Sequence, residues 1–142
     1  MDFQLNDTQL MYQEEVKKFV AKEVRPRIFE FDQKSNPMDA LPIDILNKGL
    51  DQGYHLMVVP EQYGGMGLNA VSTVAILEEM AAGDAGFATT WHVNNIALTT
   101  LLNMGSDEEV EEFIKDIMDG KGGVAALSTT EPDGGVTSSL LI

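Results

Sequence analysis

The chain has 142 residues, 44% hydrophobic and 23% charged, a composition typical of a globular protein with one sizeable core. The absence of cysteine excludes disulfides and thiolate metal sites. The net charge of −14 opposes binding to nucleic acid and to anionic membranes, and no apolar run approaches the roughly 18 residues of a membrane span. The acidic N-terminus lacks the pattern of a secretory signal, so we expect a cytoplasmic protein.

The first third of the chain has helical periodicity. Asn6 followed by Gln9 predicts a capping box, and apolar residues then recur at helical spacing as far as Val24. We expect this helix to end before Pro26, because the residue before a proline avoids the α region, and Pro26 to begin a short second helix. A third helix is predicted over residues 42–53.

A glycine-rich stretch, Val-Pro-Glu-Gln-Tyr-Gly-Gly-Met-Gly at residues 59–67, separates these helices from the next ones. It lacks the Lys-Ser or Lys-Thr of a phosphate loop, so we interpret it as a tight turn between helices. Helices are predicted over residues 69–80 and 87–104, and the second should be central and nearly buried because it carries few charges. Ser106 and Glu109 predict a capping box for a last helix.

Metal binding and nucleophilic catalysis have little support in the sequence. The two histidines, His55 and His92, are far apart and lack metal-ligand spacing. We expect His92, between two apolar residues of the long helix, to be buried and hydrogen-bonded; a role in a ligand pocket is the alternative. The acidic residues of 107–112 are expected to form a solvated helix start, where negative charge suits the helix dipole.

The end of the chain changes character after Val124. A strand-like run is followed by Thr-Glu-Pro-Asp-Gly-Gly at residues 130–135, with short hydroxyl side chains on both sides. Exposed backbone amides and hydroxyls can hydrogen-bond a flat heteroaromatic ring or a pyrophosphate without adding charge. On local sequence alone, such a binding turn and a plain hairpin turn are equally compatible with this stretch.

Taken together, the stretches at 59–67 and 130–135 resemble motifs of the acyl-CoA dehydrogenase family, and the landmarks between them occur in the same order. The resemblance covers essentially the whole chain. It implies an all-α fold, the N-terminal helical-bundle domain of acyl-CoA dehydrogenase type, over residues 1–122. A short β segment at the C-terminal end, residues 123–142, would begin a truncated middle β-domain that carries the flavin-binding turn.

The resemblance also implies an activity. Family members are flavin-dependent oxidoreductases that use FAD to oxidise an acyl-CoA at its Cα–Cβ bond and pass electrons to an electron-transfer flavoprotein. The family's catalytic base lies in a C-terminal bundle, so no catalytic residue is assigned here, and we expect the chain alone to be inactive.

We expect a homo-oligomer or a partner subunit that carries the missing domains, and we interpret the chain as a truncated form of such an enzyme. Two alternatives are a related flavin monooxygenase or nitroalkane oxidase, and a non-catalytic helical subunit that pairs with a flavin-bearing partner.

Cofactor-binding residues are carried over from the family by position. Leu127, Thr129 and Thr130 resemble the residues that contact the isoalloxazine ring, and Gly135 belongs to the flavin turn. The turn departs from the family's Thr-Glu-Pro-Gly-Ala-Gly-Ser-Asp, because Val136 stands where the family has serine.

The long helix resembles the one that lines the family's acyl-chain cavity. Ala88, His92 and Asn95 recur at helical spacing on one face, with Thr89 adjacent, and these four residues are the predicted substrate-binding set. Bulky and polar groups at these positions favour a short or polar acyl group over a long fatty chain.

Overall fold

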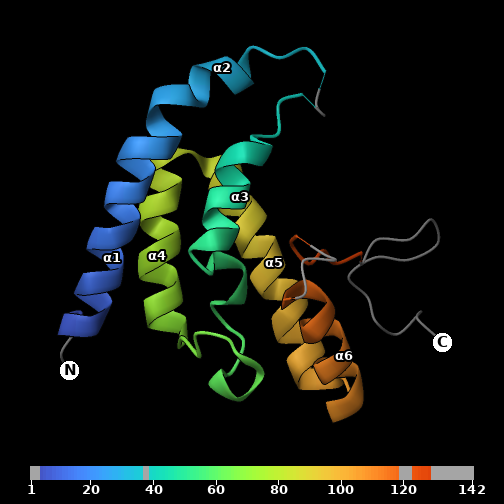
Figure 1. Cartoon of the computed structure of the whole chain (residues 1–142). Helices are drawn as coiled ribbons and strands as arrows, with labels where there is room; N and C mark the ends of the chain where they lie inside the picture. Colours follow the sequence, from blue (N-terminus) through green and yellow to red (C-terminus); the bar gives the residue numbers. More distant parts are fainter. Residues whose placement is uncertain (1–3, 37–38, 119–122, 129–142) are drawn as a thin grey trace, which may run out of the picture.

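The computed structural model describes residues 4–36, 39–118 and 123–128. The described part of the chain is helical and contains no strand (Figure 1). Its α-helices are α1 (Asp7–Phe19), α2 (Ile28–Asp32), α3 (Ile43–Asp51), α4 (Ala70–Gly83), α5 (Ala85–Met104) and α6 (Asp107–Met118). Helix α4 packs between α1 and α5, while α6 lies against the C-terminal half of α5 (Figure 1). The predicted all-α fold is confirmed.

Helix α1 begins and ends in agreement with the sequence prediction. Asn6 and Gln9 form a reciprocal capping box with bonds of 2.9 and 3.0 Å. The helix ends at Phe19, before Pro26, as expected. Between α1 and α2 the chain passes through a π-helical turn, Val20–Val24, and a 3-10 turn, Arg25–Arg27, which the sequence did not indicate. Pro26 lies in the first turn of that 3-10 segment, where a missing N–H leaves no bond unmade.

The main core lies where α1, α3, α4 and α5 meet. Its centre is a chain of aromatic rings: Phe19 contacts Tyr54 with ring centroids 5.4 Å apart, and Phe87 contacts Trp91 at 5.8 Å. Trp91 is fully buried, and a Cβ added to Gly49 of α3 would lie 2.4 Å from its ring. Helix α3 can therefore pack this closely on α5 only because position 49 is glycine.

A second core joins α5 and α6 to the segment 123–128. Leu98 of α5 and Ile114 of α6 are buried together with Val59 and Ala125. At roughly 1.5–3 kcal/mol for each fully buried large aliphatic side chain, this contact is a substantial part of what holds α6 in place.

The glycine-rich stretch is a tight turn, as predicted. Its backbone folds back on residues 56–59, with Met66 N–H donating to Leu56 C=O and Gly67 N–H donating to Val59 C=O. A Cβ on Gly65 would lie 2.1 Å from the Val59 carbonyl oxygen, so the close approach itself requires glycine.

Helices α4 and α5 are separated by a single residue, Asp84, whose carboxylate caps α5 by accepting a 2.6 Å bond from Phe87 N–H. The capping box of Ser106 and Glu109 at the start of α6 is confirmed. Residues 124–127 have no regular secondary structure, and most of the predicted β segment lies outside the described residues.

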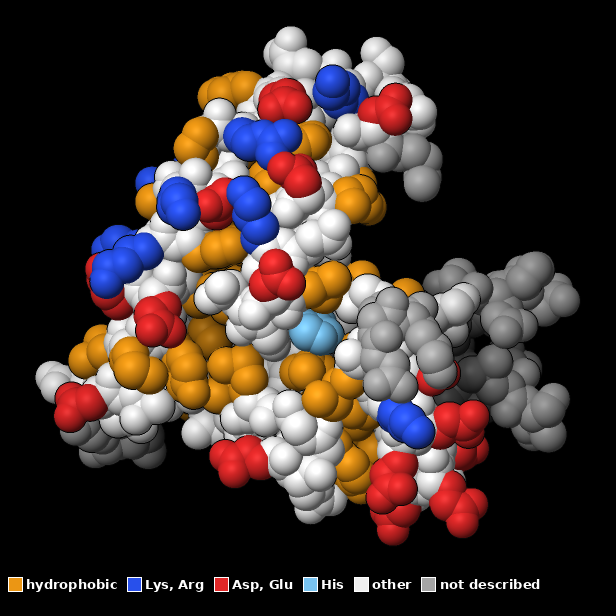
Figure 2. Space-filling model, viewed as in Figure 1, with side chains coloured by type: hydrophobic (Ala, Val, Ile, Leu, Met, Phe, Trp, Pro, Cys, Tyr) orange, Lys and Arg blue, Asp and Glu red, His pale blue; other side chains and the backbone are white. Residues whose placement is uncertain are grey.

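Charge is unevenly distributed over the surface. Figure 2 shows lysine and arginine side chains gathered over α1 and α2, and aspartate and glutamate over α6. The acidic residues at the start of α6 are all exposed, as expected for a solvated helix start: Asp107, Glu108, Glu109, Glu111 and Glu112.

No group of His, Cys, Asp and Glu within the described ranges could hold a metal ion. Nor does any helix in those ranges have both the length and the hydrophobicity needed to cross a membrane.

Candidate functional site

A groove of about 630 Å³ runs between α4 and α5 and is the main candidate for a ligand site. We call it the α4–α5 groove. Val74 and Leu77 of α4 and Ile96 of α5 form apolar walls, with Val58 and Leu68 at one end. Val74 and Ile96 are 59% and 41% exposed, so the walls present apolar surface to whatever lies in the groove.

Two of the four predicted substrate-binding residues line this groove, namely His92 and Asn95. Ala88 belongs to the main core instead, and Thr89 is exposed with its hydroxyl donating to the Ala85 carbonyl at 2.7 Å. The expectation that His92 is buried is wrong. One position after the fully buried Trp91, the helix has turned far enough to place His92 on the outer side of α5.

Asn95 gives the groove an unusual polar feature. Its side chain is only 5% exposed, and neither Oδ1 nor Nδ2 has a hydrogen-bond partner among the described residues. Buried amides in native proteins are almost always paired, because an unpaired one costs about 1–3 kcal/mol. Both polar atoms of Asn95 are buried beneath the groove lining, so the amide holds one acceptor and two donors without a partner among the described residues.

Its neighbour Asn94 is fully buried, and both polar atoms of its side chain have hydrogen-bond partners. Asn94 Nδ2 donates a 2.8 Å bond to the His55 carbonyl, and Asn94 Oδ1 accepts a 2.8 Å bond from the Ala125 N–H. Sequence reasoning missed this residue, because its partners are 39 and 31 positions away and no local motif indicates these contacts.

Of the predicted flavin contacts, the structure describes only Leu127. It is 41% exposed and lies two residues after the buried Ala125. Thr129, Thr130 and Gly135 lie outside the described residues. The segment 123–128 carries no charged side chain, and Val124 and Leu127 are its exposed large apolar residues.

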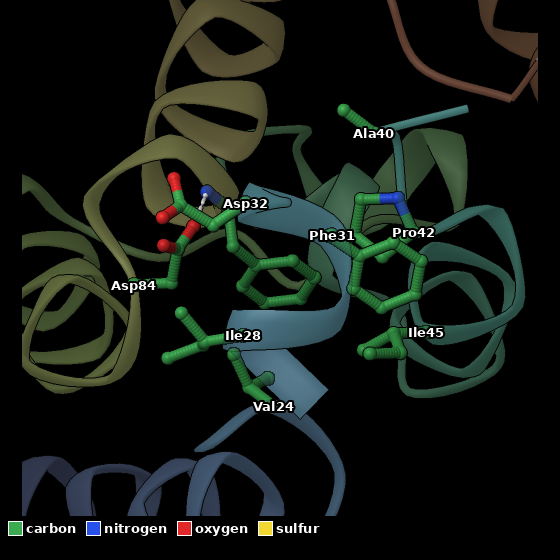
Figure 3. A pocket seen from close by; sticks show the side chains of 9 residues that line it. Val24, Ile28, Phe31, Asp32, Ala40, Pro42, Ile45 and Asp84 are labelled. Carbon is green, nitrogen blue, oxygen red and sulfur yellow. Dashed lines mark hydrogen bonds between the residues drawn. The ribbon is translucent and has the colours of Figure 1, made fainter. Parts of the chain in front are cut away.

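A second, smaller hollow of about 210 Å³ lies between α2, α3 and the start of α5. Ile28, Phe31 and Ile45 surround it, and Figure 3 shows the carboxylates of Asp32 and Asp84 at one end. Asp84 is already engaged as the cap of α5 (Figure 3). The apolar lining of this hollow continues the main core. Unlike the α4–α5 groove, it is lined by no side-chain amide among the described residues.

Burial favours the neutral form of two ionisable groups near the core. Burial raises the pKa of the Tyr54 hydroxyl to about 12, with a smaller contribution from Glu15. Burial lowers the pKa of His55, whose Nδ1 is buried without a partner among the described residues. Tyr54 is far from the range of a general acid or base at neutral pH, which assigns it a packing role.

These features define, in the part of the chain that the structure describes, an all-helical domain with a ligand-sized groove along α5. The sequence matches the family model for the acyl-CoA dehydrogenase N-terminal domain over residues 6–121. This chain therefore belongs to the acyl-CoA dehydrogenase family.

Individual relatives agree with this placement. The chain is 30% identical over 121 residues to a probable acyl-CoA dehydrogenase, FadE25, of Mycobacterium tuberculosis, covering 84% of this chain and 30% of the relative. Butyryl-CoA dehydrogenase from Megasphaera elsdenii superposes with a TM-score of 0.81 at 26% identity, over 98% of this chain and 36% of that one. A chain in a structure of the electron transferring flavoprotein of Acidaminococcus fermentans gives a TM-score of 0.83 at 28% identity, over 99% of this chain and 36% of that one.

Nitroalkane oxidase shares the fold as well, with a TM-score of 0.82 at 23% identity over 94% of this chain and 32% of that one. The present chain thus spans about a third of the length of the proteins it matches.

Proposed function

We propose that this chain is the N-terminal domain of a flavin-dependent dehydrogenase that oxidises an acyl-CoA at its Cα–Cβ bond. The observation that carries the proposal is the α4–α5 groove, whose lining combines apolar side chains of both helices with His92 and the unpaired Asn95. Membership of the acyl-CoA dehydrogenase family supports the reaction class. The groove supports a role for this domain in binding the acyl group.

In this proposal the acyl group lies along α5. Val74, Leu77 and Ile96 contact its hydrocarbon part, and His92 and Asn95 meet a polar group on it. Leaving the Asn95 amide unpaired against a long hydrocarbon chain would be costly, so the groove favours an acyl group that is short or carries a hydrogen-bonding group. That specificity follows from Asn95 alone and does not depend on the reaction.

FAD, when bound, would accept the β-hydrogen as a hydride while a base takes the α-proton. In this chain Leu127 would hold one edge of the ring, and Thr129, Thr130 and Gly135 would supply polar contacts. No base is assigned to the present chain.

We further propose that electrons pass to an electron-transfer flavoprotein and that the domain works in a larger assembly, as a homo-oligomer or with a partner subunit. The alternative chemistry of nitroalkane oxidase gains nothing from a likeness that shows the fold alone.

The test uses the 142-residue chain itself. Isothermal titration calorimetry measures the binding of acyl-CoA and of free CoA, while visible absorption and equilibrium dialysis report on FAD. We expect a short acyl-CoA to bind more tightly than free CoA. Val74→Asp, which puts a charge in the groove wall, should weaken acyl-CoA binding by about tenfold or more.

Val71→Asp is the matched control. Val71 lies on the same helix and is 55% exposed, against 59% for Val74, but it does not line the groove. Equal binding of free CoA and acyl-CoA, or an equal response to both substitutions, would contradict a binding role for the groove. Retention of FAD with a perturbed spectrum would show that residues 127–135 contribute to a cofactor site.

A further inference from the structure

The segment 123–128 meets the helical bundle at one buried residue. Within it, Ala125 is buried and the others are exposed. The methyl group of Ala125 belongs to the second core with Leu98 and Ile114, and its N–H donates to Asn94 Oδ1 at 2.8 Å. Among the described residues, this apolar contact and this hydrogen bond are the buried contacts of the segment.

These two contacts differ in what they can specify. Burial of a methyl group is non-directional, and Ala126 next to it could supply an identical methyl group after a slip of one residue. A hydrogen bond from a backbone N–H to a fully buried amide is directional, and the acceptor cannot move, because the other end of the amide is bonded to the His55 carbonyl. The register of the segment is thus decided by Asn94.

We propose that Asn94 is a positioning residue, which holds the segment that leads into the flavin turn in one register against α5. The bond at Ala125 sets where Leu127 emerges, two residues further on. Because Asn94 also bonds the His55 carbonyl, it ties this segment to the turn that follows α3. The inference rests on the proposed function only for the identity of the molecule that the segment meets.

The experiment measures amide hydrogen exchange and the heteronuclear nuclear Overhauser effect in the 15N-labelled 142-residue chain. Asn94→Leu removes both hydrogen bonds with little change in side-chain size. We expect the Ala125 amide to exchange at least about tenfold faster, and Leu127 to become more mobile, while the amide of Leu98 in the same helix changes much less. Asn47→Leu, at an exposed site of α3, is the control and should leave Ala125 unchanged.

Two more variants separate positioning from general stability. Asn94→Asp keeps an oxygen that can accept from Ala125 but loses the N–H that bonds the His55 carbonyl, so protection at Ala125 should be restored in part, to a level between Asn94→Leu and wild type. Ala125→Pro removes the donor N–H, sets a ring carbon against Asn94 Oδ1 and leaves the sequence of α5 unchanged; it should mobilise Leu127 even if Asn94→Leu does not fold.

The inference is overturned if Ala125 and Leu98 respond equally to Asn94→Leu, or if Ala125→Pro leaves Leu127 as rigid as before. Because none of these measurements involves flavin, a chain that retains no FAD would count against the cofactor part of the proposed function and would leave this result intact.

Discussion

Asn94 and Asn95 are neighbours on α5 and both are buried, yet only Asn94 has hydrogen-bond partners among the described residues. The helix turns about 100° per residue, so the two amides enter different surroundings. Asn94 faces the second core, where backbone groups of two other segments meet it. Asn95 faces the α4–α5 groove, where the nearby walls are apolar.

The same substitution should therefore have opposite effects at the two positions. Asn94→Leu leaves the His55 carbonyl and the Ala125 N–H without their partner, and we expect it to lower the free energy of unfolding by about 2–4 kcal/mol. Asn95→Leu removes two unpaired polar atoms and adds apolar surface, and we expect it to raise that free energy by about 1 kcal/mol. Urea denaturation followed by circular dichroism measures both. A loss of stability in Asn95→Leu would show that its amide is paired in solution.

Gly65 should tolerate no side chain. In Gly65→Ala the new Cβ would lie 2.1 Å from the Val59 carbonyl oxygen and 2.4 Å from Val59 Cβ, so backbone must move. We expect a loss of about 2–3 kcal/mol in the free energy of unfolding. The matched variant Gly123→Ala, whose Cβ would meet Leu50 at an ordinary 3.9 Å and no other described residue, should be close to neutral. Equal stability of the two variants would show that the turn at 59–67 can open without cost.

Gly49 offers a test of packing against helix propensity. Within a helix, glycine to alanine ordinarily stabilises by up to about 1 kcal/mol. At position 49 the added Cβ would lie 2.4 Å from the Trp91 ring, in a core with no room to spare. We expect Gly49→Ala to destabilise by about 1–3 kcal/mol and to shift the Trp91 emission spectrum. A stabilised variant with unchanged emission would mean that α3 packs less tightly on α5 than the structure shows.

Glu109 should make part of the stability depend on acid pH. Hydrogen bonds from the Ser106 backbone N–H and hydroxyl hold the pKa of the Glu109 carboxyl below its ordinary value of 4.5. A folded-state pKa below the unfolded one contributes stability above the unfolded value, and that contribution is lost as pH falls through the folded value. Wild type should therefore lose stability below about pH 4.5 more steeply than Glu109→Gln. Urea titrations between neutral and acid pH would show this, and parallel curves would contradict it.

The features that local sequence could predict are those whose partners lie close along the chain. The capping boxes at Asn6 and at Ser106 each join residues three positions apart, and both formed as predicted. The turn at 59–67 was likewise predictable, because its glycines serve backbone conformations that only nearby residues impose. The helix order and the motifs that mark the family share this local character.

Only the tertiary structure decided which face of α5 is buried and that a π-helical turn precedes Pro26. Helix α5 carries small, apolar or uncharged polar residues on every side, so its sequence has no strong periodicity to say which side faces the core. Packing against α1 and α4 placed Ala88 in the core and left His92 exposed, against the expectation of a buried His92. The π-helical turn before Pro26 follows from packing too, because Val20 and Val24 stay buried in one continuous core through it. The role of Asn94 depends on contacts across 31 and 39 residues, and folding alone brings such distant groups within hydrogen-bond distance.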